Sequence, residues 1–108
     1  MDRLQNRSGV LQAVIDDIHQ SNGQLSISKL AERNSISIRQ LERNFKTHVG
    51  ITPKEYSNIV RFQNALAAIK SPDMKRSLLD IAFEYGYYDH SHLTNEIKRN
   101  TGLSPSQL

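Results

Sequence analysis

The sequence of 108 residues predicts an all-α protein. Apolar residues recur three or four positions apart in six segments, which is the spacing of amphipathic helices. Hydroxyl residues or aspartate stand before several of these segments, and glycines follow four of them, as expected at helix starts and ends. Alternation of apolar and polar residues, which is typical of a strand, is limited to the short run from Leu25 to Ser28.

The first half of the chain predicts three helices. Apolar spacing gives one helix over residues 10–21 and a short one over residues 27–34. The third starts at Ser37, which forms a Ser-x-x-Gln capping box with Gln40. We expect this helix to turn four apolar residues toward the core: Ile38, Leu41, Phe45 and Val49.

The second half predicts a long helix followed by two shorter ones. The long helix covers residues 53–70 behind a Thr52 cap, and Ser71-Pro72-Asp73 is expected to end it. A fifth helix covers residues 78–85, and a sixth runs to residue 101 from a cap at residue 89. We expect Asp89 to cap the sixth helix, and Leu93 and Ile97 to be buried.

An internal repeat organises these helices. Leu30-Ala31 matches Ile81-Ala82 at an offset of 51 residues, and from Ser37 onward the offset is 52, because the second turn is one residue longer at residues 86–88. A short helix, a tight turn and a longer capped helix therefore occur twice. The further matched pairs are Ser37 with Asp89, Leu41 with Leu93, Phe45 with Ile97, Lys46 with Lys98, Gly50 with Gly102, and Pro53 with Pro105.

The repeated unit fits the description of a helix-turn-helix motif. A small residue, Ala31 or Ala82, lets the two helices of each unit approach closely. The predicted organisation is two helix-turn-helix subdomains, residues 1–51 and 71–108, joined by a linker helix at residues 52–70. In such a motif the second helix lies in the DNA major groove, and its N-terminal half meets the base edges.

The third helix presents a cationic stripe on the face opposite its apolar residues. Arginine can donate two hydrogen bonds to the guanine edge, and lysine supplies a point charge to phosphate. A solvated face, with an ion pair from Glu42 to Arg39 or Lys46, is the alternative interpretation. The repeat favours DNA binding through four residues: Arg39, Glu42, Arg43 and Lys46.

The sixth helix presents shorter polar groups on the equivalent face. Asparagine there can bond bidentately to adenine. Residues 37–49 carry a net charge of +2 and residues 89–101 a net charge of zero, so we expect the first unit to supply more of the salt-dependent affinity. The candidate DNA contacts of the sixth helix are His90, Ser91, Thr94, Asn95 and Lys98.

Composition limits the classes of function. The chain has no cysteine, which excludes disulfides, thiolate zinc ligands and cysteine nucleophiles. Its formal net charge is +3 and its pI is near 9.4, which suits a nucleic-acid partner. No apolar run is long enough for a membrane span or a signal peptide, so we expect a cytoplasmic protein without a membrane partner. Motifs for phosphate binding, metalloproteases or an activated nucleophile are missing, so we expect no catalytic residue, cofactor or small-molecule ligand.

Two further patterns have ordinary interpretations. His90 and His92 point roughly 200° apart on a helix, so they are not expected to share a metal ion. Three tyrosines near the second turn are expected to pack between helices rather than stack on bases: Tyr85, Tyr87 and Tyr88. A helical protein–protein interaction module is the alternative function, and it would require exposed apolar residues that the polar outer faces of the third and sixth helices do not offer.

These motifs together resemble the DNA-binding domain of AraC/XylS-type bacterial transcription regulators. The resemblance covers almost the whole chain and implies two helix-turn-helix subdomains that bind double-stranded promoter DNA, usually to activate transcription, with RNA polymerase as a further partner. By position it implies base contacts from Arg39, Glu42, Arg43, His90, Ser91, Thr94 and Asn95. It is carried by Leu30-Ala31, Ser37, Leu41, Arg43, Phe45-Lys46, Gly50, Pro53, Tyr56, Arg61, Ala65, Ile81-Ala82, Gly86-Tyr87, Asp89, Ser91, Lys98, Gly102 and Ser104-Pro105.

The chain departs from the family pattern at a few positions. Aliphatic Leu93 and Ile97 stand where aromatic residues are usual, and Asn95 stands where arginine is frequent. Asn34-Ser35 replaces the glycine found at Gly86, and we expect the asparagine to tolerate left-handed geometry there. A last capping box at Ser104 has almost no helix after it. We therefore expect an output domain taken from a longer regulator, whose natural chain continues past Leu108.

Overall fold

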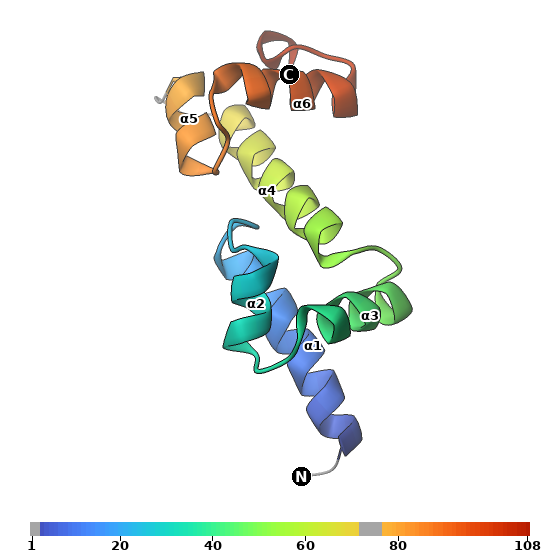
Figure 1. The fold of residues 1–108 in the computed structure, drawn as a ribbon. Helices are drawn as coiled ribbons and strands as arrows, with labels where there is room; N and C mark the ends of the chain where they lie inside the picture. The colour runs from blue at the N-terminus through green and yellow to red at the C-terminus, as the bar shows by residue number, and fades with distance from the viewer. Residues whose placement is uncertain (1–2, 72–76) are drawn as a thin grey trace. The chain divides into compact units, whose positions relative to one another are not determined.

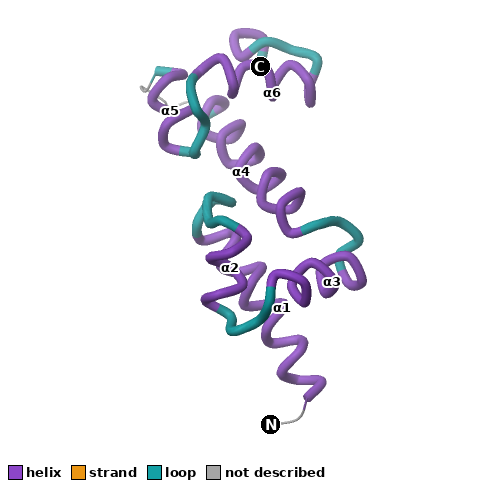
Figure 2. Tube along the Cα trace, viewed as in Figure 1, coloured by secondary structure: helices purple, strands orange, loops and turns teal. Residues whose placement is uncertain are grey.

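The computed structural model describes residues 3–71 and 77–108, with side chains from residue 9 onward, and this part of the chain contains helices and no strand. The all-α prediction is confirmed (Figures 1 and 2). The elements are α1 (Arg3–Gln20), α2 (Ile27–Arg33), α3 (Ile38–His48), α4 (Pro53–Lys70), α5 (Leu78–Glu84), α6 (His90–Thr101) and the short 3-10 helix η1 (Pro105–Gln107).

Helix boundaries follow the predicted caps closely, except at the start of α1. This helix begins at Arg3, seven residues before the predicted start at Val10. Residues 3–9 are almost entirely polar, so the apolar spacing gives no signal for a helix there. At the end of α4, Lys70 is the last helical residue as predicted; the proposed terminating residues Pro72 and Asp73 lie outside the described part of the chain.

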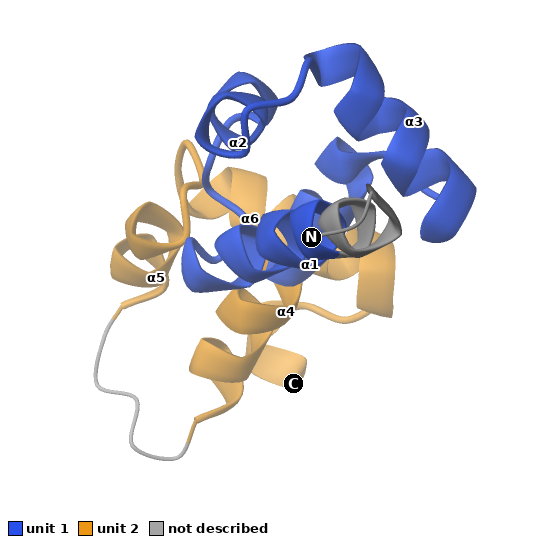
Figure 3. Cartoon of the chain, turned by 90° about the horizontal axis from the view of Figure 1, so that it is seen from below, with its two compact units in different colours: residues 1–60 blue, residues 61–108 orange. Residues whose placement is uncertain are grey.

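The chain divides into two compact units within α4, residues 1–60 and residues 61–108 (Figure 3). The sequence set residues 52–70 apart as a linker, whereas the structure shares α4 between the units: Val60 belongs to the first core and Ala65 to the second. The first core contains Val14, Ile18, Leu30, Ala31, Leu41, Phe45 and Val60. The second contains Ala65, Ile81, Ala82, Tyr87, Leu93 and Ile97.

The prediction that α3 buries four apolar residues is wrong for one of them. Leu41 and Phe45 are buried and Val49 is partly buried, but Ile38 is 45% exposed. All four lie on one face of the helix, yet Ile38 occupies its first turn. A position on the apolar face is buried only where another element lies over it, and the first turn of a helix is where such cover most easily ends.

The two turns of the repeat use the same backbone geometry with different residues. The backbone N–H of Ile36 donates to the carbonyl of Ala31 at 3.1 Å, and that of Tyr87 donates to Ala82 at 2.8 Å. The left-handed residues are Ser35 (φ 55°) and Gly86 (φ 81°). The expectation that asparagine takes this geometry is therefore wrong.

Asn34 keeps a negative φ because its side chain has another role. Its φ is −106°, and its amide nitrogen donates to the Asp17 carboxylate at 3.1 Å and to the Leu30 carbonyl at 2.8 Å. The bond to Asp17 ties the end of α2 to α1, and the bond to Leu30 closes the last turn of α2. The strained conformation falls on Ser35, which carries a Cβ atom where the second unit has none.

Replacement of Ser35 by glycine is expected to raise the free energy of unfolding by about 0.5 to 1 kcal/mol. The left-handed conformation costs an L-residue roughly 1–2 kcal/mol, and glycine removes this cost. The greater backbone freedom of glycine in the unfolded chain cancels about 0.5–1 kcal/mol of that stabilisation. Urea unfolding followed by circular dichroism measures the change. Ser35→Ala, which keeps the Cβ atom, is the matched control and should not stabilise the protein. A glycine variant no more stable than the wild type would contradict the assigned strain.

Candidate nucleic-acid interface

The start of α3 is fixed by reciprocal hydrogen bonds. The backbone N–H of Gln40 donates to Ser37 Oγ at 3.1 Å, and the backbone N–H of Ser37 donates to Gln40 Oε1 at 3.2 Å. This is the capping box that the sequence predicts. It satisfies two backbone donors that the helix itself leaves unpaired, and so it defines where the helix begins.

The inner face of α3 is anchored through aromatic contacts. Phe45 is fully buried, and its ring meets that of Tyr56 edge-on, with 5.7 Å between centroids. The Tyr56 hydroxyl is hydrogen-bonded to His19 Nε2 at 2.8 Å. These contacts join α3 to α1 and to the first half of α4. With the inner face held in this way, the opposite face of α3 must point into solvent.

The four predicted residues of α3 share that outer face. All are exposed, as the sequence predicts for a DNA-reading surface: Arg39, Glu42, Arg43 and Lys46. Within the described part of the chain no salt bridge links any of them to another side chain, so the ion pairs considered as an alternative do not form. Three cations on one stripe of a helix are therefore available to an anionic partner.

The start of α6 is fixed by Asp89. Its carboxylate accepts a hydrogen bond from the backbone N–H of His92 at 2.9 Å. Leu93 and Ile97 are completely buried, so the two aliphatic residues fill the positions where the family pattern has aromatic ones. The helix ends at Gly102, whose φ of 75° suits a residue without Cβ.

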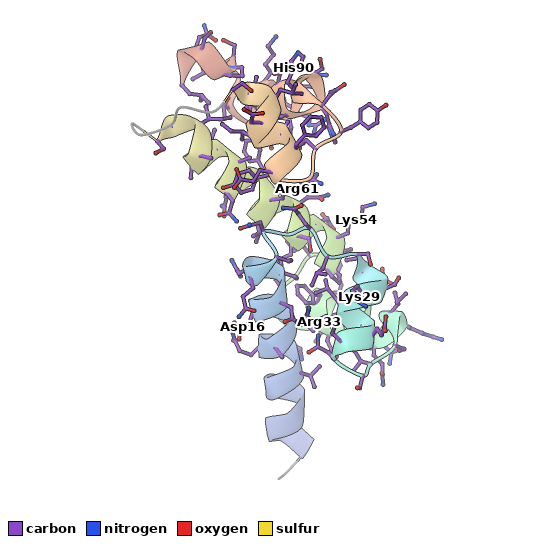
Figure 4. The ribbon with its side chains drawn as sticks, turned by 90° about the vertical axis from the view of Figure 1, so that its left-hand side faces the viewer. Asp16, Lys29, Arg33, Lys54, Arg61 and His90 are labelled. Atoms are coloured by element: carbon purple, nitrogen blue, oxygen red, sulfur yellow. The ribbon has the colours of Figure 1, made fainter. Side chains whose placement is uncertain are left out.

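The outer face of α6 carries the five predicted polar residues. Four of them are exposed (His90, Ser91, Asn95 and Lys98), and Thr94 is half-buried. Figure 4 marks His90 at the beginning of this helix. Together these residues offer hydrogen-bond donors and acceptors, with Lys98 as the cation of the stripe.

The charge balance of α6 differs on its surface from the balance in its sequence. Glu96 is only 7% exposed, and Asp89 is engaged as the N-cap. The zero net charge counted over residues 89–101 therefore includes a carboxylate that does not lie on the outer face. Among the predicted contact residues α3 has three cations and α6 has one, Lys98, but Arg99 is a second exposed cation of α6.

A buried cluster around Tyr87 explains where the Glu96 charge lies. Figure 4 labels Arg61, which lies on α4. Its guanidinium carbon is 4.5 Å from the centroid of the Tyr87 ring. Burial, and then the negative charge of Glu96, raise the pKa of Tyr87 to about 12, while the positive charge of Arg61 opposes this rise. The sequence did not predict this cluster, because its members are far apart in the chain. It holds α6 against the middle of α4.

The tyrosines at the second turn do not all pack as predicted. Tyr87 is 3% exposed and Tyr85 is half-buried, but Tyr88 is 86% exposed, so the prediction is wrong for Tyr88. His92 supports this turn: its ring meets Tyr87 edge-on at 5.1 Å between centroids, and its Nδ1 atom accepts a hydrogen bond from the Tyr88 backbone at 3.4 Å.

In the described ranges, no helix is both long and apolar enough to cross a membrane.

A comparison with known families identifies the fold. A family model described as a helix-turn-helix domain matches residues 30–108, which include both candidate reading helices. The transcriptional activator RhaS of Escherichia fergusonii is 33% identical over 84 residues, which are 78% of this chain. The chain belongs to the AraC-type helix-turn-helix family. It is a DNA-binding domain of the kind found in transcription regulators, and the family is not one of enzymes.

Other relatives of this AraC-type domain agree. The transcriptional regulator MtrA of Neisseria gonorrhoeae is 33% identical over 99 residues, which are 91% of the chain. The chain spans only 30% of the length of RhaS and 31% of that of MtrA.

Solved structures show the same fold. A transcriptional regulator with an AraC-type DNA-binding domain, from Chromobacterium violaceum, matches with a TM-score of 0.81 at 22% identity, over 93% of this chain and 88% of the other. The C-terminal domain of AraT, a response regulator from Geobacillus stearothermophilus, matches with a TM-score of 0.78 at 22% identity, over 91% and 81% of the two chains.

Replacement of Arg61 by methionine is expected to lower the free energy of unfolding by about 1 to 2 kcal/mol, because it removes a partly desolvated cation from an aromatic face. Tyr87→Phe is the matched control. It keeps the ring that faces Arg61 and removes only the hydroxyl, so its loss of stability should be smaller than that of Arg61→Met. Urea unfolding at constant pH measures both. An equal loss in the two variants would assign the stabilisation to the hydroxyl instead.

Proposed function

We propose that this AraC-type domain binds specific sequences of double-stranded promoter DNA in the bacterial cytoplasm, as the output domain of a transcription activator. The observation that carries the proposal is the exposed cationic stripe of α3, free of salt bridges, on a helix whose inner face is buried. The name of RhaS as an activator supports activation. In this proposal α3 and α6 enter successive major grooves.

The residues of α3 divide between base recognition and phosphate binding. Arg39 and Arg43 donate to guanine edges, and Glu42 accepts from the amino group of cytosine. Lys46, near the end of the helix, binds a phosphate as a point charge. Arginine supplies both sequence preference and part of the electrostatic affinity, whereas lysine supplies affinity alone.

The residues of α6 read DNA mainly through hydrogen bonds. Asn95 is suited to a bidentate contact with adenine, and His90 and Ser91 lie in the first turn, where a reading helix meets the base edges. Thr94 adds a hydroxyl one turn later, and Lys98 binds phosphate. Because the predicted contacts include one cation on α6 against three on α3, we expect α6 to contribute less to the salt-dependent part of binding.

The linker α4 sets the separation and phase of the two reading helices. Its 18 residues give a helix about 27 Å long, comparable with one turn of DNA at about 34 Å. Val60 of α4 belongs to the first core and Ala65 to the second, so one helix connects the two units.

A protein partner is supported by a separate observation. Leu79 and Phe83, one turn apart on α5, are 42% and 63% exposed. Such an apolar pair, outside the polar stripes, suits contact with a protein. We propose RNA polymerase as that partner in activation, and the same pair is what favours a protein-interaction function as the second candidate.

Replacement of Arg39 or Arg43 by alanine is expected to cost about 1 to 3 kcal/mol of binding free energy on a duplex selected from a randomised pool, and to relax base preference at one position. Lys46→Ala should weaken selected and random duplexes alike and lower the slope of log affinity against log salt by about one. Fluorescence anisotropy titrations at several salt concentrations measure these effects.

The folded state of each variant is controlled by circular dichroism. Arg33→Ala is a matched control, since this exposed arginine of α2 is paired with Asp17 at 3.4 Å and lies outside the reading stripe. Helical arginine variants that still prefer the selected duplex over random DNA as strongly as the wild type would overturn the assignment of α3.

Insertion of one alanine between Val60 and Arg61 tests the mechanical role of α4. These residues lie at the boundary between the units, so each core keeps its own register. One added helical residue rotates the second unit by about 100° relative to the first, so simultaneous binding of both half-sites should be lost. Footprinting should show protection of the first half-site alone. An unchanged footprint would mean that the two reading helices act independently.

A further inference from the structure

The second turn contains a residue that has no counterpart in the first. Equivalent backbone hydrogen bonds pair Ile36 with Tyr87, and the N-caps of the reading helices pair Ser37 with Asp89. Between Ile36 and Ser37 there is no residue, whereas Tyr88 stands between Tyr87 and Asp89. Tyr88 is therefore the extra residue of the second unit.

The backbone of Tyr88 is held while its side chain lies in solvent. Its N–H donates to His92 Nδ1 at 3.4 Å, in the first turn of α6. On one side Tyr87 is 3% exposed, and on the other Asp89 caps α6. The ring itself is 86% exposed. An aromatic side chain with two rotatable bonds, mounted on a fixed segment, loses little conformational freedom on binding.

The location and chemistry of this side chain suit the DNA backbone. It precedes the N-terminal turn of α6, the end of a reading helix that approaches DNA, but it lies before the helical stripe that would enter the groove. Tyrosine hydroxyls are among the groups that bind phosphate oxygens. The exposed cations of α6, Lys98 and Arg99, lie in its last turn, so a phosphate contact from Tyr88 would act at the opposite end of the helix.

We propose that the Tyr88 hydroxyl donates a hydrogen bond to a phosphate oxygen beside the second half-site and so fixes the register of α6 on the duplex. This inference rests on the proposed DNA binding. It assigns Tyr88 a positioning contact rather than base recognition, so the loss on its removal should be equal for all base sequences of the second half-site.

The first test removes the hydroxyl alone. Tyr88→Phe should bind a duplex selected from a randomised pool roughly tenfold to a hundredfold more weakly than the wild type does, as expected for one hydrogen bond to a charged acceptor. The slope of log affinity against log salt should not change, because a phenol displaces no counterion. Lys98→Ala is the matched comparison in the same unit, and its slope should fall by about one.

The second test locates the phosphate. Phosphates around the second half-site are replaced one at a time by uncharged methylphosphonates. At one of them the wild type should lose affinity while Tyr88→Phe loses none, because the variant has already lost that bond. At other phosphates the two proteins should respond equally. Tyr85→Phe, which removes a hydroxyl from a half-buried tyrosine of the same turn, should keep the wild-type pattern.

Two outcomes would overturn the inference. Tyr88→Phe could bind within error of the wild type, or it could retain binding while Tyr88→Ala loses it, which would assign the contact to the ring and a base. Because the ring is exposed, both variants should remain folded by circular dichroism. In either outcome wild-type binding to the selected duplex would still support the proposed function. If the wild type did not bind, both the proposed function and the inference about Tyr88 would be contradicted.

Discussion

Burial of one apolar stripe on each reading helix is the constraint on which the rest of the structure depends. Leu41 and Phe45 on α3, and Leu93 and Ile97 on α6, are at most 1% exposed. A helix held along one side in this way cannot rotate about its axis without exposing that stripe. The polar residues opposite are thereby fixed in solvent, at the spacing of helical turns, and N-caps at Ser37 and Asp89 define where each stripe begins. The exposure of these polar residues is thus a consequence of core packing.

Much of this could be predicted from sequence because the signals are local. A capping box, a proline at a helix start and apolar residues one turn apart each reflect interactions within a few residues of chain, and the duplication repeats them. The exposure of the polar stripe on α3 follows from such local periodicity. What the sequence missed depends on contacts between distant residues. Burial of Glu96 near Arg61 and Tyr87, and the exposure of Ile38, are set by which elements lie over a side chain, and helical spacing does not contain this information.

The turns show a second limit of sequence interpretation. Asparagine tolerates positive φ better than serine does, so propensity favours Asn34 as the left-handed residue. In the structure the Asn34 amide is engaged by Asp17 and Leu30, and Ser35 takes the strained position instead. Tyr88 illustrates the same point in the second turn, since it is exposed while its neighbour Tyr87 is buried. The turns of the two units share one backbone geometry. They differ in which residue adopts the left-handed conformation, Ser35 or Gly86, and in the side chains that they expose.

The account depends most directly on two stripes reading one duplex at a separation set by α4. The wild-type domain can be used to select bound sequences from a duplex pool randomised over about three helical turns. The selected sequences measure this separation without any change to the protein. The account predicts two conserved segments centred about 10 base pairs apart, with the stronger preference in one of them. A single conserved segment, or two whose spacing varies freely among the selected duplexes, would contradict it.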